Sequence, residues 1–164
     1  MRKINLIVIH CTASPNGRPM SISQIRKEHM QRGFSDIGYH YVINVDGSIM
    51  KGRPEQLVGA HAKDHNANSL GIALVGGLGG PDKLNPGKFT DAQWDSLKTL
   101  VVDLSLHFPG MGVTGHRDLS PDLDGDGQIE PSEWIKLCPT FDVGDWLAAG
   151  MRPEPAHVLE PPNA

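Results

Sequence analysis

The sequence has no hydrophobic run long enough to cross a bilayer. A membrane-spanning helix needs about 20 consecutive apolar residues, and the run behind the basic start of the chain, Ile4 to Ile9, is short and interrupted by Asn5. His10 and Cys11 follow it directly, which indicates a first β-strand rather than the apolar core of a signal peptide. We therefore expect no membrane insertion, no export signal and synthesis in the cytoplasm.

The sequence has few cysteines. It also has no stripe of basic residues. Its 2 cysteines, Cys11 and Cys138, exclude a disulfide framework. Six of the 19 acidic residues lie in the segment 118–134, which holds no lysine or arginine, so the rest of the chain has 13 acidic and 15 basic residues. The net charge of -4 therefore belongs to one short segment, and nothing indicates a partner of nucleic acid.

The composition and length predict one globular domain. Hydrophobic residues make up 38% and charged residues 21% of 164 residues, enough for one buried core and too few for two comfortable domains. No internal repeat is present. We assign residues 1–151 to this domain and read 152–164, with four prolines and little apolar content, as a flexible tail.

Strand and helix patterns alternate along the chain, which is typical of an α/β fold. Ser21 with Gln24 and Thr90 with Gln93 form two capping boxes, each of which begins a helix. Asp46-Gly47 predicts a hairpin turn. We expect strands at 4–10, 38–45, 49–51, 70–75 and 113–116, and a closing helix at 142–149. The glycine-rich run 76–80 lacks the GxGxxG order of a nucleotide loop, so we interpret it as a mobile loop.

Three residues with metal-ligating side chains stand at the ends of predicted elements. They are His10 after Ile7-Val8-Ile9, His116 after Val113-Thr114-Gly115, and Cys138 before Pro139. Two imidazoles and a thiolate fill three corners of a zinc tetrahedron and leave one open, which is the arrangement of a catalytic zinc site.

The residues around these ligands match a known family in several blocks and in one order. The blocks are His10-Cys11-Thr12-Ala13, Gly38-Tyr39-His40-Tyr41, His61-Ala62-Lys63 through Asn68-Ser69-Leu70-Gly71, Gly115-His116-Arg117-Asp118 and Lys136-Leu137-Cys138-Pro139. Over residues 4 to 147 the chain resembles the zinc-dependent N-acetylmuramoyl-L-alanine amidases of the phage T7 lysozyme and peptidoglycan-recognition-protein type. The resemblance implies a central mixed β-sheet flanked by helices, with Zn²⁺ held by His10, His116 and Cys138.

The resemblance also implies roles for residues near the metal. Lys136 of the Lys-x-Cys-Pro motif is expected to stabilise an oxyanion. Tyr39 of the Gly-Tyr-His motif is expected to position or deprotonate the attacking water, or to donate to the developing charge. Tyr41, two residues on and expected on the same strand face, is its competitor. Further along, His61, Asn66 and Asn68 are candidates for substrate binding, although an ordinary polar loop fits these three nearly as well.

Cys11 and Cys138 receive different roles. A zinc-binding Cys138 must be an unpaired thiolate. Cys11 follows His10 on a strand and so points to the opposite face, where we expect a small buried hydrophobe.

The acidic segment departs from the family pattern. Residues 122–133 fit an EF-hand calcium loop, with Gly127 at its sixth position. The expected Ca²⁺ ligands are Asp122, Asp124, Asp126, Gln128 and Glu133. Ser120-Pro121 precludes a normal entering helix, and no second hand is present. We predict a lone calcium loop rather than an ion-free acidic turn, because carboxylates clustered without a cation would repel one another.

These observations predict a monomeric zinc amidase that cuts peptidoglycan. A phage or prophage endolysin that reaches the cell wall after release through the membrane fits best. The alternatives are a bacterial autolysin or recycling amidase, and a non-catalytic peptidoglycan-recognition module. A calcium sensor is disfavoured because it needs paired hands.

Overall fold

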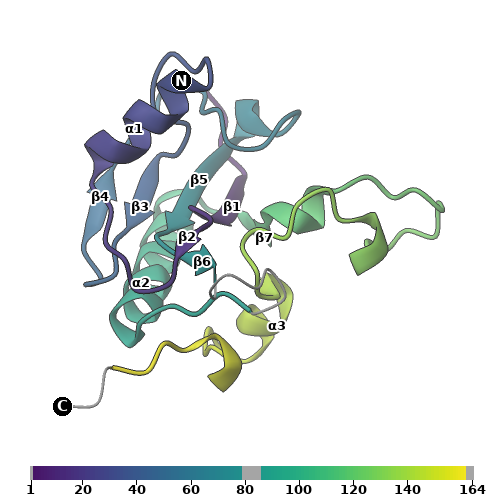
Figure 1. Ribbon diagram of the computed structural model, residues 1–164. Coiled ribbons are helices and arrows are strands. Elements are labelled where there is room, and N and C mark those ends of the chain that lie inside the picture. Colours follow the sequence, from purple (N-terminus) through teal and green to yellow (C-terminus); the bar gives the residue numbers. More distant parts are fainter. Residues whose placement is uncertain (1, 79–85, 162–164) are drawn as a thin grey trace.

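Strand β1 (Leu6–Cys11) runs parallel to both of its neighbours, β5 (Ser69–Leu74) and β7 (Gly112–Gly115). The computed structural model describes residues 2–78 and 86–161, and within them the main sheet has the order β4-β3-β5-β1-β7 (Figure 1). Strand β3 (Tyr41–Ile43) is parallel to β5, and its hairpin partner β4 (Ile49–Lys51) is antiparallel to it. The expected α/β fold with a mixed central sheet is confirmed.

Both predicted capping boxes begin helices. At the start of α1 (Ile22–Gln31), the N–H of Gln24 donates to Ser21 Oγ and the N–H of Ser21 donates to Gln24 Oε1. Thr90 and Gln93 repeat this exchange at the start of α2 (Asp91–His107). Each box satisfies backbone donors that the first helical turn leaves unpaired. No helix in the described ranges is both long and apolar enough to cross a membrane.

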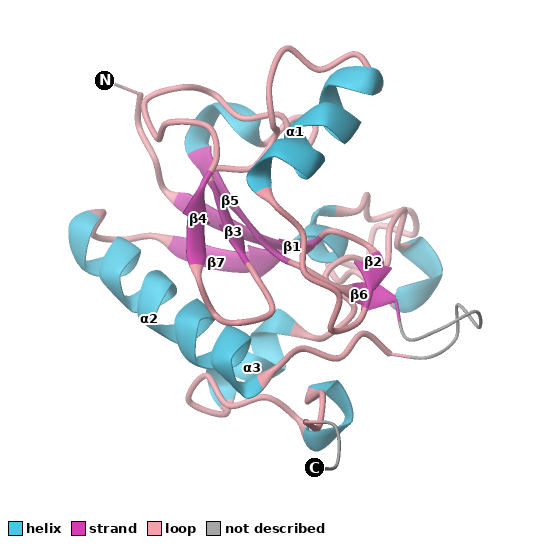
Figure 2. Cartoon of the chain, turned by 60° about the vertical axis from the view of Figure 1, so that its left-hand side comes forward, coloured by secondary structure: helices cyan, strands magenta, loops and turns pink. Residues whose placement is uncertain are grey.

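The helices cover opposite faces of the sheet (Figure 2). On one face, α2 and α3 (Val143–Ala148) pack against alternate residues of β1 and β5 in a core that includes Ile7, Ile9, Leu70, Ile72, Trp94, Leu97 and Trp146. On the other face, Ile25 of α1 packs with Val42 and Ala73. Because side chains alternate along a strand, Cys11 joins the α2 face and His10 the α1 face. Burial of Cys11 in that core agrees with its predicted role.

Short elements connect this frame. They are β2 (Ser14–Pro15), β6 (Gly77–Leu78), and the 3₁₀ turns η1 (Asn66–Asn68), η2 (His116–Leu119), η3 (Pro131–Glu133) and η4 (Pro155–His157). Strands β2 and β6 pair in parallel, so part of the glycine-rich run is ordered as a strand. Residues 79 and 80 of the run lie outside the described ranges.

Part of the proline-rich tail is bonded to the domain, which its composition alone does not indicate. The N–H of Phe89 donates to the carbonyl of His157, and the N–H of Leu159 donates to the carbonyl of Phe89. Trp94 Nε1 also donates to the His157 carbonyl, at 3.1 Å. Composition does not predict these contacts, because they are backbone hydrogen bonds to the segment around Phe89 and do not require apolar side chains in the tail. Residues 162–164 lie outside the described ranges.

Candidate metal centre and catalytic cleft

A cleft of about 630 Å³ opens at the end of the sheet where β1 and β7 finish. Carboxyl ends of parallel strands meet at one edge of a sheet, which is where α/β proteins build their binding sites. The lining residues come from every segment that meets this edge: His10, Cys11, Thr12, Ala13, His29, Arg32, Phe34, Tyr39, Ala60, His61, Ala62, Lys63, Asp64, Asn66, His116, Leu119, Ile135, Lys136 and Cys138. Most of the residues predicted for the site therefore line one cavity.

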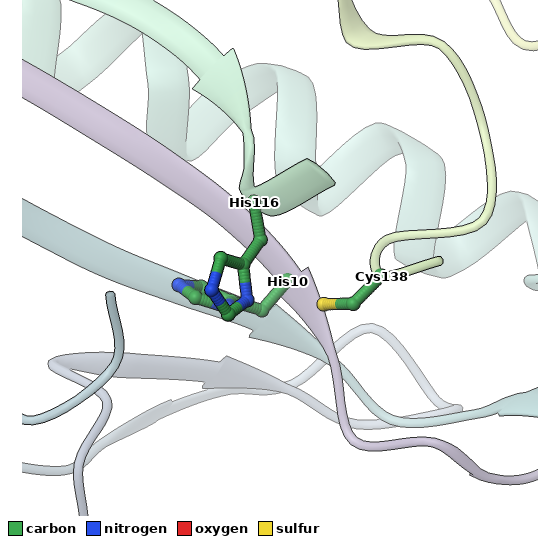
Figure 3. Close-up of side chains that lie close together, drawn as sticks. All are labelled: His10, His116 and Cys138. Atoms are coloured by element: carbon green, nitrogen blue, oxygen red, sulfur yellow. The ribbon is translucent and has the colours of Figure 1, made fainter. Parts of the chain in front are cut away.

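His10, His116 and Cys138 converge in this cleft (Figure 3). His10 is the penultimate residue of β1, and His116 directly follows β7. The centroids of the two imidazole rings are 4.6 Å apart. The Cys138 thiol faces these rings from the loop that follows η3 in the sequence. One potential ligand atom from each residue lies within 4.8 Å of the other two. Three donors that are 106 and 22 residues apart in sequence thus reach one point.

The donor set fits zinc. Zinc bonds to imidazole nitrogen and thiolate sulfur are about 2.0–2.3 Å long, so donors on one tetrahedral ion lie about 3.3–3.8 Å apart. Burial is the main cause that lowers the pKa of His116, to about 4, and it holds the pKa of His10 well below its usual range. Both imidazoles are therefore neutral at pH 7, with a lone pair free for a metal.

The third donor, Cys138, must lose a proton to bind a metal. Its hydrogen bond with the Cys11 thiol and its burial raise the pKa of the Cys138 thiol, while the N–H of Cys11, 3.1 Å from Cys138 Sγ, opposes this effect. Both cysteines are free. A cation at this point is needed to hold Cys138 as the thiolate at neutral pH.

Lys136 lines the cleft beside these donors, on an exposed segment. Its positive charge contributes to lowering the pKa values of His10 and His116, after burial as the main cause. Lys136 therefore shares the cleft with the candidate metal ligands.

Tyr39 lines the cleft, whereas Tyr41 does not. The Tyr39 ring lies 5.2 Å from the His10 ring, between centroids. The Tyr41 hydroxyl donates to Glu55 and lines a separate hollow. The two tyrosines do not share a face as expected, because β3 begins only at Tyr41 and the strand alternation does not extend back to Tyr39. Burial raises the pKa of Tyr39 above its ordinary value of 10.0, so its phenol stays protonated at neutral pH.

The three predicted substrate-binding residues are placed differently from one another. Asn66 lines the cleft, but its Oδ1 accepts the backbone N–H groups of His61 and Ala62, each at 2.9 Å. Asn68 lies outside the cleft lining, and its amide donates to Asn5. His61 is 8% exposed and lies behind His10, with its Nδ1 2.9 Å from His10 Nε2. All three make hydrogen bonds within the protein, and His61 and Asn66 also line the cleft.

Several cleft residues were missed from the sequence. His29 of α1 accepts the N–H of Gly38 at its Nδ1 and packs edge-on against Tyr39. Arg32 and Lys63 add positive charge to the lining. Their positions in an amphipathic helix and a polar loop carry no signal that separates them from ordinary surface residues, so only the tertiary fold reveals them.

The acidic segment forms a projecting loop without EF-hand helices, since only the 3₁₀ turns η2 and η3 flank it (Figure 1). Asp122 accepts the N–H groups of Gly125 and Gly127, and Glu133 accepts those of Leu123 and Asp124. Oxygens of Asp122, Asp124 and Glu133 lie within 4.8 Å of one another, and those of Asp124, Asp126 and Glu130 form a second such group. Backbone amides already satisfy part of these carboxylates.

Comparison with known proteins shows the family of the chain. The family model for N-acetylmuramoyl-L-alanine amidase matches residues 1–132. The endolysin of Escherichia phage T7 is 36% identical over 140 residues, 85% of this chain and 83% of the relative. A peptidoglycan-recognition protein of Drosophila melanogaster is 34% identical over 121 residues, 71% of this chain and 65% of the relative. The solved structure of the N-acetylmuramoyl-L-alanine amidase LysC from Clostridium intestinale URNW aligns with a TM-score of 0.70 and 30% identity, covering 92% of this chain and 86% of that chain. The resemblance seen in the motif blocks is confirmed, and the chain belongs to the N-acetylmuramoyl-L-alanine amidase family.

Proposed function

We propose that this protein hydrolyses the amide bond between the lactyl group of N-acetylmuramic acid and L-alanine in peptidoglycan, with zinc held by His10, His116 and Cys138. The observation that carries the proposal is the convergence of these three donors in a cleft that also contains Lys136 and Tyr39. A zinc ion in such a site supplies a Lewis acid that lowers the pKa of water from about 15.7 to about 7 and polarises a carbonyl.

The chain supplies the remaining groups. Lys136 presents a fixed positive charge where an oxyanion develops, and this charge stabilises the transition state more than the ground state. A tyrosine with an ordinary pKa near 10 is already protonated at neutral pH, and burial raises the pKa of Tyr39 further, so the role that fits Tyr39 is hydrogen-bond donation. Of the roles that the sequence left open for Tyr39, donation is the one that the environment of the phenol supports.

The combination of residues favours catalysis over recognition alone. A module that only binds peptidoglycan has no need of an open metal corner beside a lysine and a protonated phenol. We propose that the protein acts as a monomer, since the named groups belong to one chain, and that it has no nucleic-acid partner, since the sequence has no basic stripe. The endolysin relatives favour a phage or prophage origin, with action on the cell wall after release through the membrane.

Digestion of purified peptidoglycan tests the proposal. Products are identified by mass spectrometry for untreated, chelated and zinc-restored protein. Free stem peptides that begin with L-alanine, lost on chelation and regained with zinc, are expected. Binding to peptidoglycan without released peptide would instead establish a recognition module. A second experiment expresses the protein inside cells. Lysis only after the membrane is permeabilised would indicate an endolysin, and lysis without permeabilisation would indicate a secreted autolysin.

We also propose that the loop 122–133 takes Ca²⁺ through Asp122, Asp124, Asp126, Glu133 and the carbonyl of Gln128. The support is the EF-hand pattern together with two groups of carboxylate oxygens that repel one another without a cation. Because the loop leads directly to Lys136 and Cys138, calcium binding is expected to raise the melting temperature and to strengthen zinc retention. Identical melting with and without calcium, or an Asp122→Ala/Glu133→Ala variant that responds to calcium like wild type, would refute it.

A further inference from the structure

His61 lies between a proposed metal ligand and a buried hydroxyl. Its Nδ1 is 2.9 Å from Nε2 of His10, and its Nε2 is 3.1 Å from Oγ of Ser69. Ser69 in turn donates its hydroxyl proton to the backbone carbonyl of His65, at 2.7 Å. His10, His61 and Ser69 are 2%, 8% and 0% exposed, so these bonds are shielded from water.

The positions of the protons follow from this chain of bonds. A hydroxyl has one proton, and Ser69 uses it on the His65 carbonyl, which can only accept. Ser69 Oγ must therefore accept from His61, which places the His61 proton on Nε2. No carboxylate or other acceptor within the described ranges contacts Nδ1 of His61, so this atom accepts the Nε2 proton of His10. His10 is then left with its lone pair on Nδ1.

The fold holds the His61 ring closely in this place. A Cβ atom on Gly71 of β5 would lie 2.5 Å from His61 Cγ, and one on Gly59 would lie 2.8 Å from His61 Cδ2. Real carbon contacts are not so short, so the ring occupies space that exists only because these residues are glycines. The backbone N–H of His61 is also held, by Asn66 Oδ1 at 2.9 Å.

We propose that His61 is a positioning residue, with Ser69 as its anchor: the pair fixes the tautomer and orientation of His10 so that Nδ1 is the atom presented to the metal. This replaces the substrate-binding role expected from the sequence. It rests on the proposed function in so far as His10 binds zinc. A partner on the second ring nitrogen typically changes metal affinity by about 10–100-fold.

The tautomers are measured directly in metal-free protein. Long-range ¹H–¹⁵N correlation spectra of ¹⁵N-histidine-labelled wild type are expected to show both His10 and His61 protonated at Nε2. Ser69→Ala removes the acceptor that holds the His61 proton on Nε2. This variant is expected to give a mixture of tautomers at His10 and His61. His10 protonated at Nδ1 in the wild type would overturn the proposal. This readout requires neither zinc nor amidase activity, so it stands or falls separately from the proposed function.

Zinc affinity, measured by competition with a chelator, tests the consequence. Asn and Leu have nearly the same shape, but only Asn offers an acceptor near the position of Nδ1. His61→Leu is expected to bind zinc about 10–100-fold more weakly than wild type, and His61→Asn to recover part of the loss. Equal losses in both variants would contradict the proposal. A raised KM with unchanged zinc affinity would restore the substrate-binding role.

Two further variants separate positioning from folding. Ser96→Ala removes a hydroxyl that, like that of Ser69, donates to a backbone carbonyl, but on α2 and away from the cleft. It should leave zinc affinity unchanged. Gly71→Ala displaces the His61 ring without removing any polar group and should weaken zinc binding as His61→Leu does. Wild-type zinc affinity in folded Gly71→Ala, judged by its metal-free melting curve, would count against the proposal.

Discussion

The backbone N–H of Cys11 donates to the Sγ of Cys138 across 3.1 Å, joining the end of β1 to a loop 127 residues further along the chain. This bond brings the third candidate ligand to the edge of the sheet where His10 and His116 already lie. It also favours the charged form of the sulfur, because hydrogen bonds to a thiolate stabilise it. The candidate metal centre is thus brought together at the sheet edge rather than by any local motif.

Cys138→Ser should remove bound zinc and nearly all amidase activity while leaving the fold intact. A serine hydroxyl keeps the hydrogen bond from Cys11 but is a much weaker zinc ligand than a thiolate. Zinc content after gel filtration, together with the melting curve of metal-free protein, checks this. Retention of stoichiometric zinc by the variant would show that Cys138 is not a ligand.

Lys136→Met should lower kcat by about 10²–10³-fold, the effect of removing one oxyanion-stabilising group. Zinc content should not change, because the ammonium does not bind the metal. Lys63→Met is the matched control, since Lys63 is another exposed lysine of the same cleft. Equal kcat losses in the two variants would indicate a general charge effect instead of a specific role for Lys136.

Tyr39→Phe should reduce kcat, whereas Tyr41→Phe should retain nearly full activity because the Tyr41 hydroxyl is bonded to Glu55 outside the cleft. A Tyr39 phenol that only donates a hydrogen bond does not titrate near neutral pH, so the pH–rate profile of Tyr39→Phe should keep the shape of the wild-type profile at lower amplitude. Loss of one limb of the profile in that variant would indicate that Tyr39 acts as a base after all.

Metal-free protein should become less stable as the pH falls from about 6.5 to about 4. Burial lowers the folded-state pKa values of His40, His61 and His116 to about 4, 3 and 4, from an ordinary 6.5. In this window the unfolded chain binds more protons than the folded one, so stability falls by up to about 1.4 kcal/mol per pH unit for each histidine. Urea unfolding in the presence of a chelator measures the slope. His40→Gln should make it shallower, and a flat profile would mean that these histidines are not desolvated.

The features that the sequence predicted correctly, such as the helix starts and the strand alternation, depend on residues close together in the chain. The capping boxes at Ser21 and Thr90 depend on residues three positions apart, and both form as expected. The alternation that separates His10 from Cys11 is likewise a property of one strand. The three candidate ligands come from the matched motif blocks, and the parallel arrangement of β1 and β7 brings His10 and His116 together.

The features that the sequence did not predict depend on where β3 begins and on contacts between distant segments. The tail from Pro155 to Leu159 packs on Phe89, and Tyr41 is separated from Tyr39 by the late start of β3. The polar loop around His61 suggests exposure and hence a role in substrate binding. Its burial against Gly71 and Gly59 depends on tertiary packing that no local pattern reports.

Hydrolysis of a muramoyl-L-alanyl peptide in H₂¹⁸O tests the central claim most directly. The zinc-loaded protein should place one ¹⁸O atom in the lactyl carboxylate of the muramic acid product and release a peptide with a free L-alanine amino group. Chelated protein and Cys138→Ser should give neither product. Label at a sugar carbon or within the peptide, or no cleavage by the zinc-loaded protein, would contradict the assignment of this cleft to muramoyl-amide hydrolysis.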